Sequence, residues 1–137
     1  MPVEKSALPL VAVEFMNSDH HEAVDLANVL EAHLDAEDGG VDEAAVEASL
    51  RAFLDHTREH FGREEEEMLR TRFPVYSVHK GEHDRVLEDM EAIYGDWVES
   101  KDAQKLLAWV RGPLPEWLVE HIQTMDTITA QFIASAG

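Results

Sequence analysis

The sequence predicts an all-α protein, an up-down-up-down four-helix bundle preceded by an N-terminal arm. Apolar residues recur every three or four positions in four segments, which is the spacing of one helix face. Short connections that contain glycine or proline separate most of these segments, so neighbouring helices should run antiparallel. A chain of 137 residues is long enough for one core and too short for two ordinary domains. We place the arm at residues 1–16 and the bundle at residues 17–137.

Prolines at positions 2 and 9 prevent a long helix in the arm. Its apolar residues are expected to pack along the bundle, and they are Leu8, Leu10, Val11, Val13 and Phe15. The first helix is predicted to start near Asn17 or Ser18, both good N-caps, and to run to about Glu37, before a Gly39-Gly40 break. Its predicted inward stripe is His20, Val24, Ala27, Leu30 or Glu31, and Leu34.

The second helix is predicted to start after Asp42 and to continue to about Arg72. Its inward stripe is Val46, Leu50, Phe53, Thr57, His60, Glu64 and Met68. Phe73-Pro74 separates it from the third helix, because a proline ends one helix and can open the next. The third helix is predicted to reach about Glu99, with His79, His83, Val86, Met90, Ile93 and Trp97 facing inward.

The fourth helix is predicted to begin near Ala103, after a connection at residues 100–102. Gly112, Pro113 and Pro115 must kink or restart it. Beyond the kink, the predicted inward residues are Trp117, Leu118, His121, Met125, Ile128 and Phe132. The tryptophans are expected to serve core or interface packing, and they are Trp97, Trp109 and Trp117.

Histidines occupy the predicted inward face of every helix. His60 and Glu64 form one pair at i,i+4, and His79 and His83 form another, so each pair lies on one helix face. The remaining members of the set are His20 and His121 on the first and fourth helices. Five buried imidazoles without a common partner would be costly, so this pattern predicts a shared metal site.

Two acidic residues complete the predicted ligand set, Glu64 and Asp126. Asp126 lies five residues beyond His121, about 140° around an ideal helix, so it must reach sideways or the helix must widen in a π-type turn. That position is awkward for one ion and suits a bridge between two. Glu67 is the alternative to Glu64.

Several neighbouring polar residues are expected not to bind metal. Glu65 and Glu66 are interpreted as solvated helix surface, as are His21 and His33. His56, one turn before His60, is expected to support a ligand or to fill the core.

The number and chemistry of these side chains predict two metal ions, and we take iron for the count of coordination positions. With no cysteine in the chain, any metal must be held by nitrogen and oxygen, which suits iron, zinc or manganese. Two octahedral ions have roughly twelve positions. The five histidines and two bridging carboxylates fill nine, and an oxo or hydroxo bridge fills two. One position is left open for a single small molecule. A zinc site, or a bundle without metal, is the alternative.

Charge and hydropathy exclude several other functions. The chain carries 11 Lys and Arg against 29 Asp and Glu, a net charge of −18, which repels nucleic acid and anionic membranes. No segment reaches transmembrane length and the N-terminus has no signal-peptide pattern. We therefore expect a cytoplasmic protein without membrane insertion, and a monomer.

These residues also carry a family resemblance. The pattern is His20 … His60-Phe61-x-x-Glu64-Glu65-x-x-Met68 … Phe73-Pro74 … His79-x-x-x-His83 … Trp117-Leu118-x-x-His121-Ile122-x-x-x-Asp126. Over about residues 15–135 it resembles the hemerythrins, and among them the single-domain bacteriohemerythrins. Asn17 and His56 depart from the family pattern, where an aspartate and a tyrosine are frequent.

The resemblance implies a hemerythrin-like fold and assigns the ligands. His79, His83 and His121 would bind one iron, and His20 and His60 the other. Glu64 and Asp126 would bridge them, and dioxygen would bind reversibly at the iron held by two histidines. The residues expected to keep this position dry are Val24, Phe61, Leu118 and Ile122.

We therefore expect oxygen transport, storage or delivery and no enzymatic activity. Oxygen-activating di-iron sites in bundles tend to be richer in glutamate, whereas this set is rich in histidine. A di-iron oxidase, peroxidase or nitric oxide reductase is the alternative. A sensor of oxygen or iron is another, but it would need an output domain.

Overall fold

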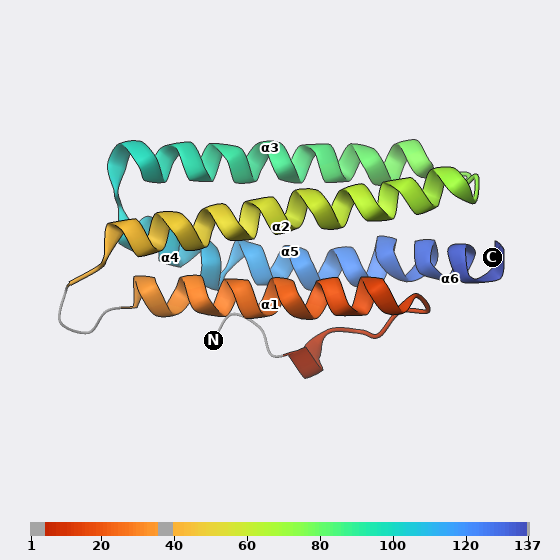
Figure 1. Cartoon of the computed structure of the whole chain (residues 1–137), viewed down its shortest axis with the longest axis horizontal. Helices are drawn as coiled ribbons and strands as arrows, with labels where there is room; N and C mark the ends of the chain where they lie inside the picture. The colour runs from red at the N-terminus through yellow and green to blue at the C-terminus, as the bar shows by residue number, and fades with distance from the viewer. Residues whose placement is uncertain (1–4, 36–39, 137) are drawn as a thin grey trace.

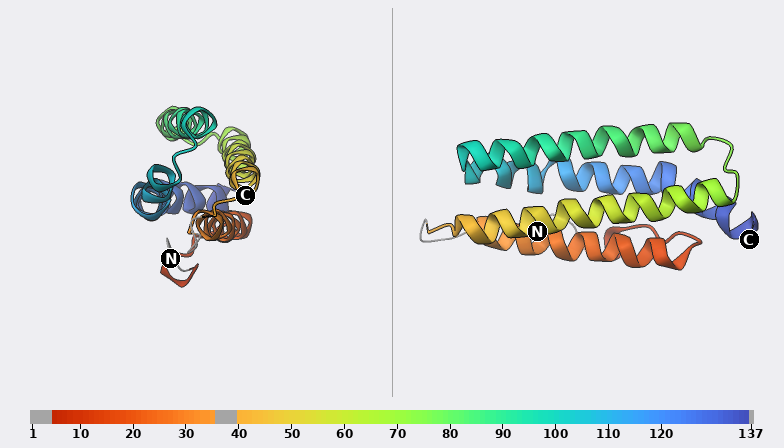
Figure 2. Two further views of the ribbon diagram at one scale, coloured as in Figure 1. Left: turned by 90° about the vertical axis from the view of Figure 1, so that its left-hand side faces the viewer. Right: turned by 45° about the horizontal axis from the view of Figure 1, so that its top comes forward.

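The computed structural model describes residues 5–35 and 40–136, and these residues form four helical columns packed as a bundle (Figure 1). An end-on view shows the columns around a common centre (Figure 2). The predicted all-α four-helix bundle is thus confirmed. The first three columns are single helices, and a short 3₁₀ turn, η1 (Lys5–Ala7), precedes them; they are α1 (Glu14–Leu34), α2 (Glu43–Arg70) and α3 (Tyr76–Ser100). The fourth column is built from α4 (Ala103–Arg111), α5 (Pro113–His121), a π-helical turn η2 (Ile122–Asp126) and α6 (Thr127–Ala136).

The N-terminal segment lies along α1 and is held to it by a side chain. The Asn17 side chain accepts a hydrogen bond from the Val11 amide at 2.9 Å and donates one to the Val11 carbonyl at 3.0 Å. The predicted helix start at Asn17 or Ser18 is therefore wrong, because α1 begins at Glu14 and Asn17 ties the arm down instead of capping. The division at residue 16 stays a prediction, although residues 14–16 already belong to α1.

The arm packs on the bundle through part of its predicted apolar set. Leu8 is buried against Val24 and Ile122, as expected, whereas Leu10 is 74% exposed, contrary to the prediction. Residues 1–4 lie outside the described part of the chain, as do Glu37 and Gly39 at the predicted end of the first helix; α1 ends at Leu34.

Backbone geometry explains where α2 starts and stops. The Asp42 side chain caps it by accepting from the Ala45 amide at 3.2 Å, and the helix starts after Asp42 as predicted. At the other end, Arg72 adopts a φ of 59°, its amide bonds the Leu69 carbonyl, and the Phe73 amide bonds the Met68 carbonyl. This is the Schellman arrangement, completed by the packing of Phe73 on Met68. The chain turns here into α3, antiparallel to α2.

The fourth column has the predicted break at Gly112 and a second irregularity at η2. The π turn adds one residue to the helix, so the inward face moves by one position beyond it. Ile128 is therefore 59% exposed, contrary to the prediction, and the buried residues are Thr129, Ala130 and Ile133. In the part of the chain that the structure describes, no helix is long and apolar enough to cross a bilayer.

The strained backbone at Arg72 generates a prediction. The left-handed conformation costs a non-glycine residue about 1–2 kcal/mol, and Arg72 is exposed. Arg72→Gly should therefore raise the free energy of unfolding by about 0.5–1 kcal/mol, measured by urea denaturation. Lys101, at a φ of 53°, is the matched control, because it also binds Glu47 and lies over the Trp97 ring. Lys101→Gly should raise the free energy of unfolding by less, because it also removes these contacts. An equal increase in both variants would contradict the explanation.

Candidate metal centre

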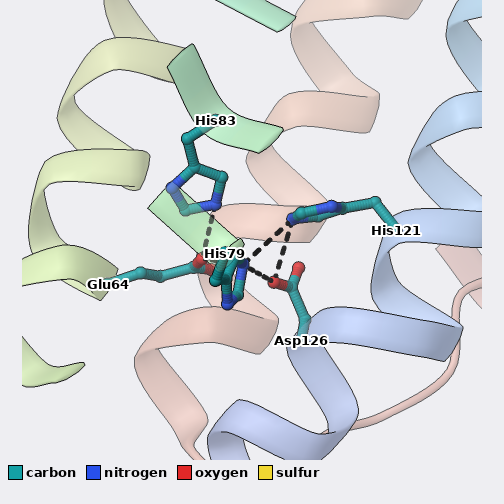
Figure 3. A group of neighbouring side chains, drawn as sticks. All are labelled: Glu64, His79, His83, His121 and Asp126. Atoms are coloured by element: carbon teal, nitrogen blue, oxygen red, sulfur yellow. Dashed lines mark hydrogen bonds and ion pairs between the residues drawn. The ribbon is translucent and has the colours of Figure 1, made fainter. Parts of the chain in front are cut away.

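Seven buried side chains from all four columns converge near the end of the bundle that carries the α2–α3 turn. They are His20 of α1, His60 and Glu64 of α2, His79 and His83 of α3, His121 at the end of α5 and Asp126 at the end of η2. Figure 3 shows five of them pointing toward one another from three columns. The structure thus brings together every residue that the sequence proposed as a metal ligand.

The ligand atoms fall into two groups that share both carboxylates. One group is Glu64, His79, His83, His121 and Asp126, and the other is His20, His60, Glu64 and Asp126. Within each group, all ligand atoms lie within 4.8 Å of one another. Three histidines therefore surround one position and two histidines surround the other.

Each carboxylate divides its two oxygens between the groups. Asp126 Oδ1 lies 3.1 Å from Nε2 of both His79 and His121, whereas Asp126 Oδ2 lies 2.9 Å from His20 Nε2. Glu64 Oε1 lies 3.3 Å from His83 Nε2, and Glu64 Oε2 lies 2.8 Å from His60 Nε2. This is the arrangement expected of two carboxylates that bridge a pair of cations.

The π turn explains how Asp126 reaches this position. An α-helix would separate residues five apart by about 140°. In a π turn the hydrogen bonds run from i to i+5, so residues five apart lie above one another. His121 and Asp126 consequently face the same centre, and the second of the two sequence-based alternatives is the correct one.

Unsatisfied polar atoms at the centre indicate a bound cation. Glu64 Oε1 and Oε2, His83 Nε2 and Asp126 Oδ1 are buried and make no hydrogen bond to any residue that the structure describes. Even the 2.8 Å contact of His60 with Glu64 lacks hydrogen-bond geometry. Leaving such groups unpaired in a protein interior is costly, and a metal ion bound by these nitrogens and oxygens removes that cost.

Carboxylates outside the centre orient two of the histidines. His60 Nδ1 donates to Asp19 Oδ2 at 2.9 Å, and the Arg63 guanidinium grips the same carboxylate at 2.7 and 3.0 Å. His83 Nδ1 donates to Glu65 Oε2, also at 2.9 Å. Each contact directs the Nε2 lone pair of its histidine toward the centre and makes the imidazole a stronger ligand.

Sequence reasoning missed these supports. Glu65, interpreted as solvated surface, is only 19% exposed and binds His83, so that interpretation is wrong. Asp19 went unnoticed because its partner, His60, is 41 residues away and no local spacing links them. Thr129, whose hydroxyl lies 2.8 Å from His79 Nδ1, was hidden by the register change at η2.

The remaining candidates lie outside both groups of ligand atoms. Glu66 and His33 are exposed and His21 is half-buried. Glu67 binds Arg70 at 2.9 and 3.0 Å and does not replace Glu64. His56 donates to the Asp19 carbonyl at 3.0 Å and stacks parallel to His60, as expected of a supporting residue.

Electrostatic coupling across the centre shifts several pKa values. Burial opposes the charged form of His60, but the Glu64 carboxylate and the bond to Asp19 outweigh it and raise the pKa of His60 to about 10. Burial likewise opposes the charged form of Asp19, yet His60 and Arg63 lower the pKa of Asp19 to about 2. Histidine contacts also hold the pKa values of Glu64 and Asp126 below their usual range, against burial.

Fold and centre together define a class of protein, the four-helix bundles that hold metal between facing helices with histidines and bridging carboxylates. The family model described as Hemerythrin HHE cation binding domain matches residues 11–133. The chain belongs to the hemerythrin family, which confirms the resemblance seen in the sequence.

Individual relatives agree with this assignment. A bacteriohemerythrin of Aquifex aeolicus is 30% identical over 117 residues, covering 85% of this chain and 86% of that protein. One of Methylococcus capsulatus is 30% identical over 119 residues, covering 85% and 84%. A crystal structure of wild-type hemerythrin superimposes with a TM-score of 0.80 at 22% identity over 98% of both chains, which shows the shared fold.

Removing a ligand should lower the metal content of the centre. His83→Ala deletes a ligand atom, removes one of the histidines beside Glu64 and leaves Glu65 without its histidine, so metal content should fall and the bundle should lose stability. His33→Ala is the matched control, because His33 is exposed in α1 and should affect neither. Elemental analysis and thermal denaturation measure both; equal metal loss in the two variants would refute the ligand assignment.

The pKa shifts predict how pH affects the metal-free protein. His60 titrates near 10 when folded and near 6.5 when unfolded, so its contribution is complete below 6.5 and is lost as pH rises toward 10. Asp19 titrates near 2 instead of 3.8, so its contribution is present above 3.8 and is lost as pH falls toward 2. The free energy of unfolding of the metal-free protein, measured by urea denaturation, should therefore be highest between about pH 4 and 6.5. A steady rise from pH 6.5 to 10 would contradict the prediction.

Proposed function

We propose that the protein holds two iron ions, joined by an oxo or hydroxo bridge, and binds dioxygen reversibly for transport, storage or delivery. The asymmetry of the centre supports this. Five protein side chains surround the first position and four surround the second. If each ion is octahedral and shares one bridging oxygen, a single site would stay free, beside His20 and His60. Two ferrous ions held by these side chains would supply the electrons for reversible dioxygen binding.

A small cavity beside the two-histidine position is the observation that carries the proposal. Its volume is about 20 Å³, and it is bounded on the side of the centre by His20, His60, His121 and Asp126. A single water molecule needs about 10–15 Å³, so the cavity admits one small molecule and little else. Both histidines of the two-histidine group line the cavity, whereas only His121 of the three-histidine group does.

The rest of the cavity wall keeps water and protons away. It is mainly apolar, and its apolar members are Ala23, Phe53, Phe61, Met90, Leu114, Trp117 and Leu118. Its polar members are already engaged, since the Thr57 hydroxyl donates to the Phe53 carbonyl at 2.9 Å and His56 bonds the Asp19 carbonyl. A mainly apolar wall whose hydroxyl and His56 imidazole are already bonded favours release of intact dioxygen over its reduction, so we infer a carrier and not an enzyme.

Of the four residues predicted to keep the site dry, two line this cavity. Phe61 and Leu118 belong to its wall, whereas Val24 and Ile122 pack with Leu8 under the N-terminal arm. Phe61 also stacks on His83 with ring centroids 3.8 Å apart, so it both fills space and fixes a ligand. The predicted monomeric state and cytoplasmic location remain part of this proposal.

Repeated oxygenation tests the proposal. Protein loaded with ferrous iron should gain an absorption band in air and lose it under vacuum over several cycles, with about two irons per chain by elemental analysis. Irreversible oxidation in the first cycle, with peroxide or water released, would instead indicate an oxidase. Zinc alone, in protein made with ample iron, would refute the iron centre.

A polar residue in the cavity wall should shorten the life of the oxygenated form. Leu118→Gln would admit water beside the open site, so the rate of decay to the ferric form should rise several-fold while iron content stays the same. Ile128→Gln is the control, because Ile128 lies in the same column but is exposed. The absorption spectrum followed over time measures both variants, and equal decay rates would argue against the dry-wall role.

A further inference from the structure

A second, larger cavity lies between α3 and the α4–α5 segment. Its volume is about 180 Å³, and it reaches the surface. Its apolar wall is Val86, Met90, Trp109, Pro113, Leu114 and Trp117. The two charged residues at its edge, Arg85 and Asp89, bind each other at 3.0 Å, so they offer an incoming molecule no unpaired charge within this wall.

This outer cavity adjoins the small cavity beside the centre. Met90, Leu114 and Trp117 belong to the walls of both, so one layer of side chains separates them. All seven side chains of the centre are buried, so a molecule can reach them only between other side chains. A molecule in the outer cavity is therefore one side-chain movement away from the two-histidine position.

Two of the three shared residues, Met90 and Trp117, differ in how easily they move. Trp117 stacks on His121 with ring centroids 4.7 Å apart and also meets the edge of Phe61, which holds its ring in place. Met90 has an unbranched, flexible side chain that adapts its rotamer at low cost. Met90 is accordingly the mobile part of the wall, and Trp117 is the fixed part.

A competing groove has a different relation to the centre. It has a volume of about 100 Å³, is lined by Val75, Val78, Met125 and Ile128, and ends at His79 and Thr129. His79 belongs to the three-histidine group and is bonded to Thr129, and this groove shares no lining residue with the small cavity. It leads to the crowded side of the centre.

From these observations we infer that small neutral molecules reach the centre through the outer cavity, past Met90. The paired charges at the edge and the apolar wall disfavour ions, and the net charge of −18 repels anions further. The inference rests on the proposed function for the identity of its natural ligand, dioxygen. The route itself is a property of the chain's own side chains.

Association and dissociation kinetics distinguish a route from a structural role. An obstacle in a path slows entrance and exit by the same factor and leaves the affinity unchanged. Val86→Phe should fill the outer cavity, which Val86 lines without touching the small one, and should slow both rate constants for dioxygen about fivefold or more. Met90→Ala should speed both. Iron content and helicity, measured first, should match those of the unaltered protein.

Val78→Phe is the matched control, being the same substitution in the same helix, in the wall of the competing groove. It should change neither rate constant by more than about twofold. If Val78→Phe slows binding and Val86→Phe does not, or if Val86→Phe changes only one rate constant, the inference is wrong.

Xenon binding to the metal-free protein separates this inference from the proposed function. Xenon-129 resonance should report a bound atom in the unaltered protein, and Val86→Phe should abolish that signal while Val78→Phe preserves it. Failure to bind dioxygen reversibly would refute the proposed function, and the xenon result would still support or overturn the route. No xenon bound, or equal binding in all three proteins, would overturn it.

Discussion

Two buried carboxylates, Glu64 and Asp126, impose the constraint on which the rest of the structure depends. Both lie at the centre of the bundle, fully enclosed, and three of their four oxygens make no hydrogen bond within the described residues. Such charges are tolerated only beside cations. The five surrounding histidines, supplied by all four columns, make the site a binding place for metal. The same buried side chains fill the core and bind the metal that neutralises the two carboxylates. Folding and metal binding are consequently coupled.

The π turn at residues 122–126 links this constraint to the architecture of the fourth column. By inserting one residue it brings Asp126 above His121, and it also turns the following helix so that Thr129 faces inward and Ile128 faces outward. Thr129 then contacts His79 Nδ1. The π turn thus places both the Asp126 carboxylate and the Thr129 hydroxyl beside the centre. It also leaves the apolar side chain of Ile128 exposed at the surface.

The two sides of the centre differ in their surroundings, as they differ in their number of histidines. The three-histidine side is packed against aromatic rings, with Phe61 on His83 and Trp117 on His121, whereas the two-histidine side borders a small cavity. Charged support is distributed to both sides, through Glu65 to His83 and through Asp19 to His60. Phe61 and Trp117 belong to both arrangements, because each packs on a histidine of the three-histidine side and also lines the cavity.

Sequence periodicity predicted the four helices and the inward faces that carry the five histidines and Glu64, because a spacing of four residues fixes which side chains share a helix face, and glycine and proline predicted the break at Gly112. It also limited Asp126 to two possibilities. The tertiary structure decided the rest. Periodicity does not give the height at which one helix faces another, so the bonds of His60 to Asp19 and of His83 to Glu65, across different helices, had no signal in the sequence. Periodicity also does not predict a change of register within a helix. Only the packed fourth column shows that a π turn directs Asp126 to the centre, and that Thr129 faces inward in place of Ile128.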